Sequence, residues 1–327
     1  MKKIIISFLL FAMPGLMLAQ TISVSGTVRD QHGFPVGFAF VIDKQNNNAT
    51  FSDSLGTYSL KAGSASQLNI NCNGYQDDSV QVSGKDHLDI LLKQNPVDAA
   101  GNQKFKNKDL DILQDAFKAN NSQYLAGHVN GIGEMVFTDV RETVGSRFLF
   151  NQWVHGYVVK NDGSLVQMKE VTFNYDKMTG DLYLSVTNAS VMLADRNIIK
   201  SFTLFSPKGQ LMTFEQVNQI SKDLYLQVIS SGPKYKIYKL YITKFIPSNY
   251  KSDGIVSSGN TYDEYTDESG YFIWNLSANT LGVLNTRKKD IKEAFAAEGS
   301  KLTDYMTAHS GKIDENYIKS LADAMNQ

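Results

Sequence analysis

The sequence predicts a mainly β protein, in which a small β-sandwich is followed by a larger antiparallel meander and then by short helices. Aromatic residues make up 11% of the chain, and flat rings are favoured on the pleated surface of a sheet. Turn signals recur about every eight to twelve residues in the first hundred positions, which is typical of a sandwich. The apolar spacing changes to the helical period from Asp290 onward. The chain has 327 residues, so more than one domain is expected.

The first residues, 1–19, are predicted to be a secretory signal peptide. Lys2 and Lys3 precede an apolar run from Ile4 to Met13. The small Ala19 predicts cleavage before Gln20. The run is shorter than the roughly 20 residues of a spanning helix, which favours cleavage over a membrane anchor, and no later run is long enough to span. We expect an exported protein that is periplasmic, associated with the outer membrane or secreted.

Residues 20–94 are predicted to form the sandwich. Alternating apolar runs are separated by polar turns at residues 30–33, 53–56 and 73–75. Cys72 is the single cysteine of the chain, so it cannot form an internal disulfide. It ends an alternating run, and we interpret it as a small apolar residue inside a sheet.

Several spaced signatures in this segment carry a resemblance to a known family. They are Ser25-Gly26-Thr27-Val28-Arg29-Asp30, Gly33-x-Pro35-Val36-x-Phe38-Ala39-x-Val41, Thr50-x-Ser52-Asp53-x-x-Gly56-x-Tyr58-Ser59-Leu60, and Gly74-Tyr75. In this order they resemble the carboxypeptidase regulatory-like domain. The resemblance implies a seven-stranded, transthyretin-like sandwich without catalytic residues of its own. In envelope proteins of Gram-negative bacteria this module is commonly an N-terminal accessory unit, including on TonB-dependent transporters.

The rest of the chain resembles no family that we recognise. Residues 95–108 are polar and predict a linker, and residues 109–327 predict one antiparallel β domain with flanking helices. A helix is expected at 109–119, long strands at 147–159 and 165–175, and further strands up to residue 284. Such a meander forms a barrel, a half-barrel or a sandwich. Helices are expected at 290–297, around 302–306 and after Asp314, a suitable N-cap.

The sequence contains no recognisable catalytic motif, and we expect no cofactor and no metal. A net charge of -1 argues against nucleic acid as a partner. None of the five histidines has Glu three residues later, so the zinc carboxypeptidase pattern is absent; they are His32, His87, His128, His155 and His309. The four carboxylates between Asp263 and Glu268 lack the spacing of a calcium loop, and we interpret them as a solvated loop.

The candidate ligand-binding residues are Tyr235, Lys236, Tyr238, Lys239 and Tyr241. Strand alternation places Tyr235, Lys239 and Tyr241 on one face, with Lys236 and Tyr238 on the other. Tyrosine rings stack on sugars or lipids, and lysine binds phosphate or carboxylate. The alternative, which the sequence favours, is an exposed strand whose lysines discourage edge pairing.

Taken together, these patterns indicate a non-enzymatic envelope or secreted protein whose larger domain binds a ligand or an envelope protein. Two alternatives stay open. One is a carrier that holds a lipid or another hydrophobic ligand in a β cavity, which the aromatic content suggests. The other is an enzyme whose site assembles from residues far apart in the sequence.

Overall fold

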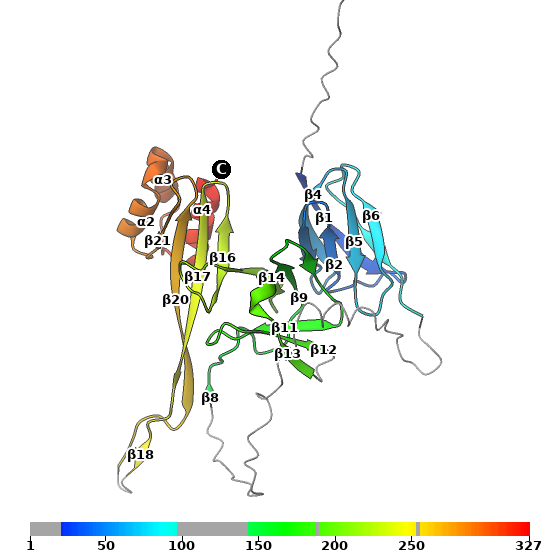
Figure 1. Cartoon of the computed structure of the whole chain (residues 1–327). Coiled ribbons are helices and arrows are strands. Elements are labelled where there is room, and N and C mark those ends of the chain that lie inside the picture. Colours follow the sequence, from blue (N-terminus) through cyan, green and yellow to red (C-terminus); the bar gives the residue numbers. More distant parts are fainter. Residues whose placement is uncertain (1–20, 97–142, 187–189, 253–255) are drawn as a thin grey trace, which may run out of the picture. The chain divides into compact units, whose positions relative to one another are not determined.

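The computed structural model describes residues 21–96, 143–186, 190–252 and 256–327. The chain divides into two compact units, residues 1–103 and residues 104–327, which we describe separately (Figure 1). The predicted cleavage site between Ala19 and Gln20 lies outside the described residues, as do the predicted helix at 109–119 and the expected linker beyond Pro96.

The first unit is a seven-stranded sandwich, as predicted. One sheet has the order β4-β1-β7 and the other the order β3-β2-β5-β6. The strands are β1 (Thr21–Asp30), β2 (Phe40–Asp43), β3 (Asn48–Phe51), β4 (Thr57–Gly63), β5 (Gln67–Asn71), β6 (Asp78–Gln81) and β7 (Ile90–Leu92). All pairings in the two sheets are antiparallel except β1 with β7.

Alternation along the strands builds the core of the sandwich. In β1, Val24 and Val28 are fully buried, and Ser25 and Thr27 on the alternate positions are half-buried. Gly26 lies between them on the same face, where a Cβ atom would come 2.0 Å from the Leu88 carbonyl oxygen, so only glycine fits. Cys72 follows β5 and is 8% exposed within this core, which confirms its expected role.

The second unit contains a nine-stranded sheet and a three-stranded sheet, and the described residues form no closed barrel. The larger sheet has the order β10-β9-β14-β15-β16-β17-β20-β21, with β8 beside β20, and the smaller sheet has the order β11-β12-β13. The strands are β8 (Thr143–Val144), β9 (Gly156–Lys160), β10 (Leu165–Val166), β11 (Val171–Tyr175), β12 (Leu182–Val186), β13 (Ser190–Leu193), β14 (Ile199–Phe205), β15 (Leu211–Gln216), β16 (Tyr225–Ser231), β17 (Tyr235–Ile246), β20 (Asp263–Asn275) and β21 (Thr280–Val283), with a small hairpin of β18 (Lys251–Ser252) and β19 (Ser257–Ser258). The antiparallel meander is therefore confirmed for β14 to β17.

Three expectations about this unit are wrong. The strand expected at 147–159 begins only at Gly156, and the residues before it make isolated bridges to the region of β11. The strand expected at 165–175 is two strands in different sheets, because a turn closed by the Val171 N–H and the Met168 carbonyl separates β10 from β11. Residues 263–268, expected to be a solvated loop, are the first half of β20.

Aromatic rings fill the space between the two sheets of the second unit. Tyr175 of β11 lies against Phe202, Phe214 and Tyr225 of the larger sheet, with ring centroids 5.3–6.3 Å apart. All four rings are at most 2% exposed. The aromatic content of the sequence thus supplies core packing in this region.

Helices cover one face of the larger sheet near its β21 edge (Figure 1). They are α2 (Lys288–Ala294), η2 (Ala296–Glu298), α3 (Gly299–Ala308) and α4 (Glu315–Met325); a further short helix, η1 (Arg196–Ile198), precedes β14. As predicted, Asp314 caps α4, and its side chain accepts a hydrogen bond from the Tyr317 N–H. Ile318 and Leu321 of α4 are buried against Ile237 of β17 and its neighbours. No helix in the described ranges is long and apolar enough to cross a membrane.

Candidate functional site

The predicted tyrosine–lysine run forms β17, which is an interior strand of its sheet. β17 pairs with β20 along its whole length from Tyr235 to Ile246, and with β16 from Lys236 to Lys239. The interpretation that the sequence favoured, an exposed strand with lysines that discourage edge pairing, is therefore wrong. An interior strand tolerates these lysines because acidic side chains from other elements meet them.

Tyr235, Lys239 and Tyr241 share one face of β17, where Tyr235 packs against the C-terminal helices and Tyr241 packs against the core between the two sheets. The Lys239 Nζ is 2.6 Å from the Glu315 Oε2 at the start of α4. The same carboxylate accepts a hydrogen bond of 2.9 Å from the Tyr271 hydroxyl. The Lys239 Nζ also lies 4.6 Å from the centre of the Tyr241 ring. We call this group the Lys239 cluster.

Two tyrosines of this face, Tyr235 and Tyr271, donate hydrogen bonds to carboxylates. The Tyr235 hydroxyl donates to the Glu298 Oε1 at 3.1 Å. Burial raises the pKa of Tyr235 to about 12, and the hydrogen bond to Glu298 adds to the increase. Burial and the hydrogen bond to Glu315 likewise raise the pKa of Tyr271 to about 12. Both hydroxyls therefore keep their protons at neutral pH, so neither is a ready general base.

The opposite face of β17 holds Lys236 and Tyr238, which share one carboxylate. The Lys236 Nζ is 3.0 Å from the Glu215 Oε2 of β15, and the Tyr238 hydroxyl donates to the same oxygen at 3.1 Å. Tyr238 is 1% exposed, so its ring is not available to a ligand. All five predicted binding residues thus have structural contacts, and the structure does not bring them together at one surface.

The acidic run of β20 is likewise used inside the sheet. Asp267 accepts a hydrogen bond from the Thr243 hydroxyl at 2.6 Å, and its other oxygen lies 2.5 Å from the Nζ of the buried Lys177. Glu268 pairs with Lys244 at 2.8 Å. Within the described ranges, no three His, Cys, Asp or Glu side chains group as metal ligands would.

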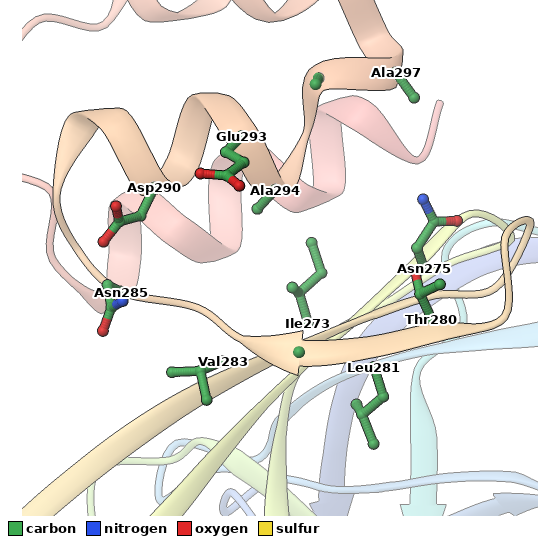
Figure 2. Close-up of a pocket in the computed structure, with 12 residues that line it drawn as sticks. Ile273, Asn275, Thr280, Leu281, Val283, Asn285, Asp290, Glu293, Ala294 and Ala297 are labelled. Atoms are coloured by element: carbon green, nitrogen blue, oxygen red, sulfur yellow. The ribbon is translucent and has the colours of Figure 1, made fainter.

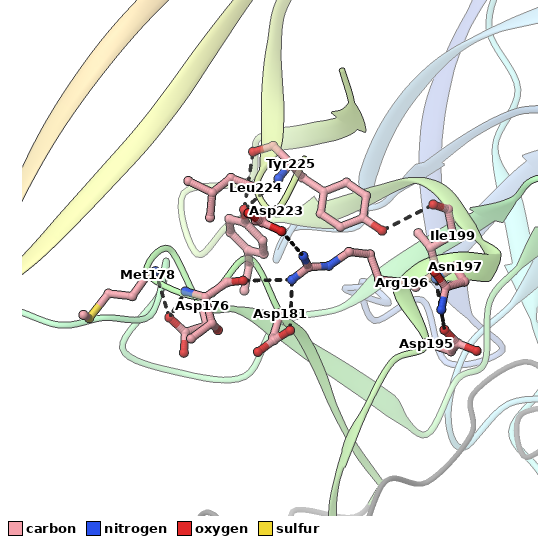
Figure 3. A network of polar contacts seen from close by, with 12 residues as sticks. Asp176, Met178, Asp181, Asp195, Arg196, Asn197, Ile199, Asp223, Leu224 and Tyr225 are labelled. Atoms are coloured by element: carbon pink, nitrogen blue, oxygen red, sulfur yellow. Dashed lines mark hydrogen bonds and ion pairs between the residues drawn. The ribbon is translucent and has the colours of Figure 1, made fainter. Parts of the chain in front are cut away.

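A second polar network holds the turn between β11 and β12. The Arg196 guanidinium donates to the Thr179 carbonyl at 2.8 Å and lies 3.1 Å from Asp181 and 3.7 Å from Asp223 (Figure 3). At the same turn the fully buried Asp176 pairs with Arg147 and accepts from backbone N–H groups. Each of these carboxylates has partners within the protein, so we assign the network to stability.

The best candidate for a binding site is a hollow between β20–β21 and α2 (Figure 2). It has a volume of about 480 Å³ and is open to solvent on one side. Ile273 points toward α2 from its floor, whereas Leu281 points away from α2. Gly282 adds no side chain to the floor, and the space above it is open, because a Cβ atom built there meets no atom within 4 Å. The remaining lining residues are Asn275, Thr280, Val283, Asn285, Asp290, Glu293, Ala294, Ala296 and Ala297.

One wall of this hollow is the free edge of the sheet. β21 is the last strand of its sheet and pairs only with β20 in the described part of the chain. The Leu284 N–H donates to the Tyr271 carbonyl of β20 at 2.7 Å. Because backbone groups alternate in direction along a strand, the N–H and C=O groups of Leu281 and Val283 point away from β20. The Val283 side chain is 65% exposed.

The opposite wall is α2, whose charged residues that line the hollow are Asp290 and Glu293, while the same helix also carries Lys288, Lys289 and Lys292. Asp290 of α2 pairs with Arg287 at 2.8 Å, which partly neutralises it. Glu293, one turn later on the same helix, is exposed and has no ion pair with any described residue. The hollow therefore combines unpaired backbone groups, open space and a carboxylate without a counter-ion, which suits a ligand with hydrogen-bonding groups and positive charge.

The sequence predicted the strand and the helix that form this hollow, but it did not predict that they lie against each other. A strand at 281–284 and a helix at 290–297 are both expected from the apolar pattern. A glycine inside a four-residue strand leaves a gap in the row of side chains on one face, and Gly282 was the available signal. Comparison of the chain with protein-family models and with curated proteins gave no match.

Proposed function

We propose that this chain is an exported, non-enzymatic binding protein whose larger unit recognises its partner at the hollow between β21 and α2. The observation that carries the proposal is the coincidence of a free strand edge with an acidic, solvent-open hollow. Binding sites are commonly concave, with a few polar groups whose hydrogen-bonding capacity is not used within the protein. The hollow meets this description.

The contrast with β17 supports this choice of site. Lys236, Lys239 and their tyrosine neighbours already form ion pairs and hydrogen bonds with Glu215 and Glu315. A ligand would have to break these contacts, whereas a ligand in the hollow would replace only water beside Glu293 and the β21 backbone.

For the first unit we propose an accessory role in a bacterial envelope. The proposal rests on the resemblance to the carboxypeptidase regulatory-like domain and on the predicted signal peptide. The periplasm, the outer-membrane surface and the exterior are the compartments that these two features suggest. We do not propose the carrier alternative, because rings such as Tyr175 and Phe202 occupy the interior between the sheets of the second unit.

The export part of the proposal is tested by N-terminal sequencing of the protein recovered from the extracytoplasmic fraction of a Gram-negative host. The expected first residue is Gln20. Recovery of the uncleaved chain from the cytoplasm would contradict export.

The binding part is tested by photo-crosslinking in the same cells. A photoreactive residue at Val283, beside the hollow, is expected to form a discrete adduct. Leu211 is the matched control, because it is a 40% exposed residue on β15, outside the set that lines the hollow. Equal labelling at the two positions, or no adduct at Val283, would count against the hollow as the binding site.

A further inference from the structure

We infer that the occupant of the hollow is an extended polypeptide that pairs with β21 as an additional strand and places basic side chains beneath α2. This inference rests on the proposed function and specifies the class of partner. The recognition mode is strand addition, in which main-chain hydrogen bonds supply affinity and alternate side chains supply specificity.

The backbone of β21 is suited to such pairing. Its sequence, Thr280-Leu281-Gly282-Val283, contains neither lysine nor proline. Lysine, proline and bulges are the usual devices by which an exposed edge avoids another strand. The pairing with β20 runs in regular register through all four residues, so no bulge turns this edge away. The outward N–H and C=O groups of Leu281 and Val283 are thus available to a partner.

Side-chain alternation then divides the added strand into two sets. Residues of one set would face α2 and enter the hollow, where Gly282 and Ala294 leave room. Residues of the other set would face away from α2, beside the Leu281 and Val283 side chains. Cross-strand neighbours of this kind interact directly, so the second set is expected to be apolar.

The charges of the hollow indicate which side chains the added strand should carry on the set that faces α2. Glu293 has no ion pair with a described residue, and Asp290 faces the same space. Lysine or arginine side chains on the set that faces α2 would give opposite-charge contacts with both. The preferred partner is therefore a strand in which basic and apolar residues alternate.

The same charges disfavour a second copy of this chain as the occupant. Two β21 strands that paired edge to edge would bring the Glu293 side chains of both copies to one junction. Like charges at such short range are destabilising. A different, basic polypeptide fits the site better.

The test uses the purified protein and an acetylated, amidated heptapeptide of sequence Lys-Val-Lys-Val-Lys-Val-Lys, with binding measured by calorimetry. The peptide is expected to bind about 100-fold more tightly than the matched Glu-Val-Glu-Val-Glu-Val-Glu peptide. Glu293→Gln should weaken binding about tenfold. Asp304→Asn removes an exposed carboxylate from α3, away from the hollow, and should leave affinity unchanged.

Backbone pairing is tested by N-methylation of the peptide. In an added strand, the N–H groups of one alternating set point toward β21 and those of the other set point to solvent. Methylation of one set, either the lysines or the valines, should weaken binding about tenfold or more, while methylation of the other set should have little effect. Val283→Pro removes one outward donor of β21, and Gly282→Val fills the hollow. Each should weaken binding of the unmodified peptide while the far-ultraviolet circular dichroism stays native.

The outcomes separate this inference from the proposed function. If both methylated peptides bind as well as the parent, or if spermidine binds equally tightly with the same dependence on Glu293, the hollow is a cation site and strand addition is overturned. If light scattering shows a dimer that Val283→Pro dissociates, the occupant is a second copy and the inference is also wrong. If neither probe binds and Val283 gives no crosslink in cells, both the inference and the proposed function fail.

Discussion

The Lys239 cluster and the hollow beside α2 lie on the same larger sheet, but they differ in whether their charged side chains are paired within the protein. In the cluster, Lys239 and Tyr271 both contact the Glu315 carboxylate. In the hollow, Glu293 has no counter-ion among the described residues. The cluster lies on an interior strand and the hollow lies at a strand edge. A dense run of charged and aromatic residues therefore identifies a site only when its polar groups are not already used by the protein.

The physical basis of the difference is desolvation. A lysine on an interior strand, half covered by helices, loses water and must find an anion nearby. An edge strand keeps water on one side, so its backbone and its acidic neighbours can stay unpaired until a partner arrives. The following predictions measure this difference as stability, from the largest expected effect to the smallest.

Among the ion pairs of this sheet, the largest effect is expected for the pair that contains the most buried lysine. Asp267→Ala leaves the Lys177 Nζ, which is almost fully buried, without its carboxylate. The free energy of unfolding should fall by about 3 kcal/mol, measured by urea denaturation. Glu268→Ala is the matched control on the neighbouring position, because its ion pair with Lys244 is exposed and should contribute less than about 0.5 kcal/mol. Equal losses would show that burial does not set the strength of these pairs.

Acid should remove part of the same stabilisation. Burial opposes ionisation of Asp267, but hydrogen bonds from Lys177 and Thr243 outweigh it and hold the pKa of this carboxyl below its ordinary value of 3.8. A carboxyl with a lowered pKa in the folded state stabilises the protein above the pKa of the unfolded chain, and this stabilisation is lost as pH falls through the folded value. The stability difference between the wild type and Asp267→Ala should therefore shrink below about pH 3.8. A difference that is constant down to pH 2 would contradict the assignment.

A smaller effect is expected from a single neutral hydrogen bond of the cluster. The Tyr241 hydroxyl donates to the Gln227 Oε1 at 2.7 Å, and Gln227 is 8% exposed. Tyr241→Phe should cost about 1 kcal/mol, because it leaves a nearly buried amide oxygen without its donor. Tyr250→Phe removes an exposed hydroxyl that contacts Ser257 and should change stability by less than about 0.5 kcal/mol. Thermal unfolding of the two variants side by side provides the measurement.

The smallest stability effect is expected in the hollow. Gly282→Val places its side chain in open space, so the free energy of unfolding should change by less than about 0.5 kcal/mol. Gly180→Val is the contrasting variant, because Gly180 has a φ of 73° and a Cβ atom there would come 1.9 Å from the Asp223 carbonyl oxygen. That variant should unfold the second unit, as judged by circular dichroism. A stable Gly180→Val protein would show that this turn can move.

Much of the fold could be predicted from the sequence because its signals are local. The turns at 30–33 and 53–56 and the alternation through Val24 and Val28 are sufficient to indicate the sandwich. Alternation also assigned the two faces of β17 correctly. The Asp314 cap is a local signal of the same kind.

The role of the predicted lysines could not be derived from the sequence, because the contacts that hold buried or half-buried lysines on this sheet are distant in sequence. Lys239 meets Glu315 across 76 residues, and Lys177 meets Asp267 across 90. No spacing rule indicates such pairs, so the lysines of β17 resembled those of an exposed strand. The hollow depends on the approach of α2 to β21, which only the folded chain defines.

The single cysteine lies in the first unit and the two tryptophans lie in the second. The unfolding of each unit can therefore be monitored by a different side chain. Cys72 is 8% exposed inside the sandwich, so a thiol reagent reaches it only when the first unit opens. Trp153 and Trp274 are the only indoles and both belong to the second unit, so intrinsic tryptophan fluorescence reports on that unit alone. Thiol labelling and fluorescence recorded during one denaturation would show whether the two units unfold together or in sequence, without a substituted or truncated chain.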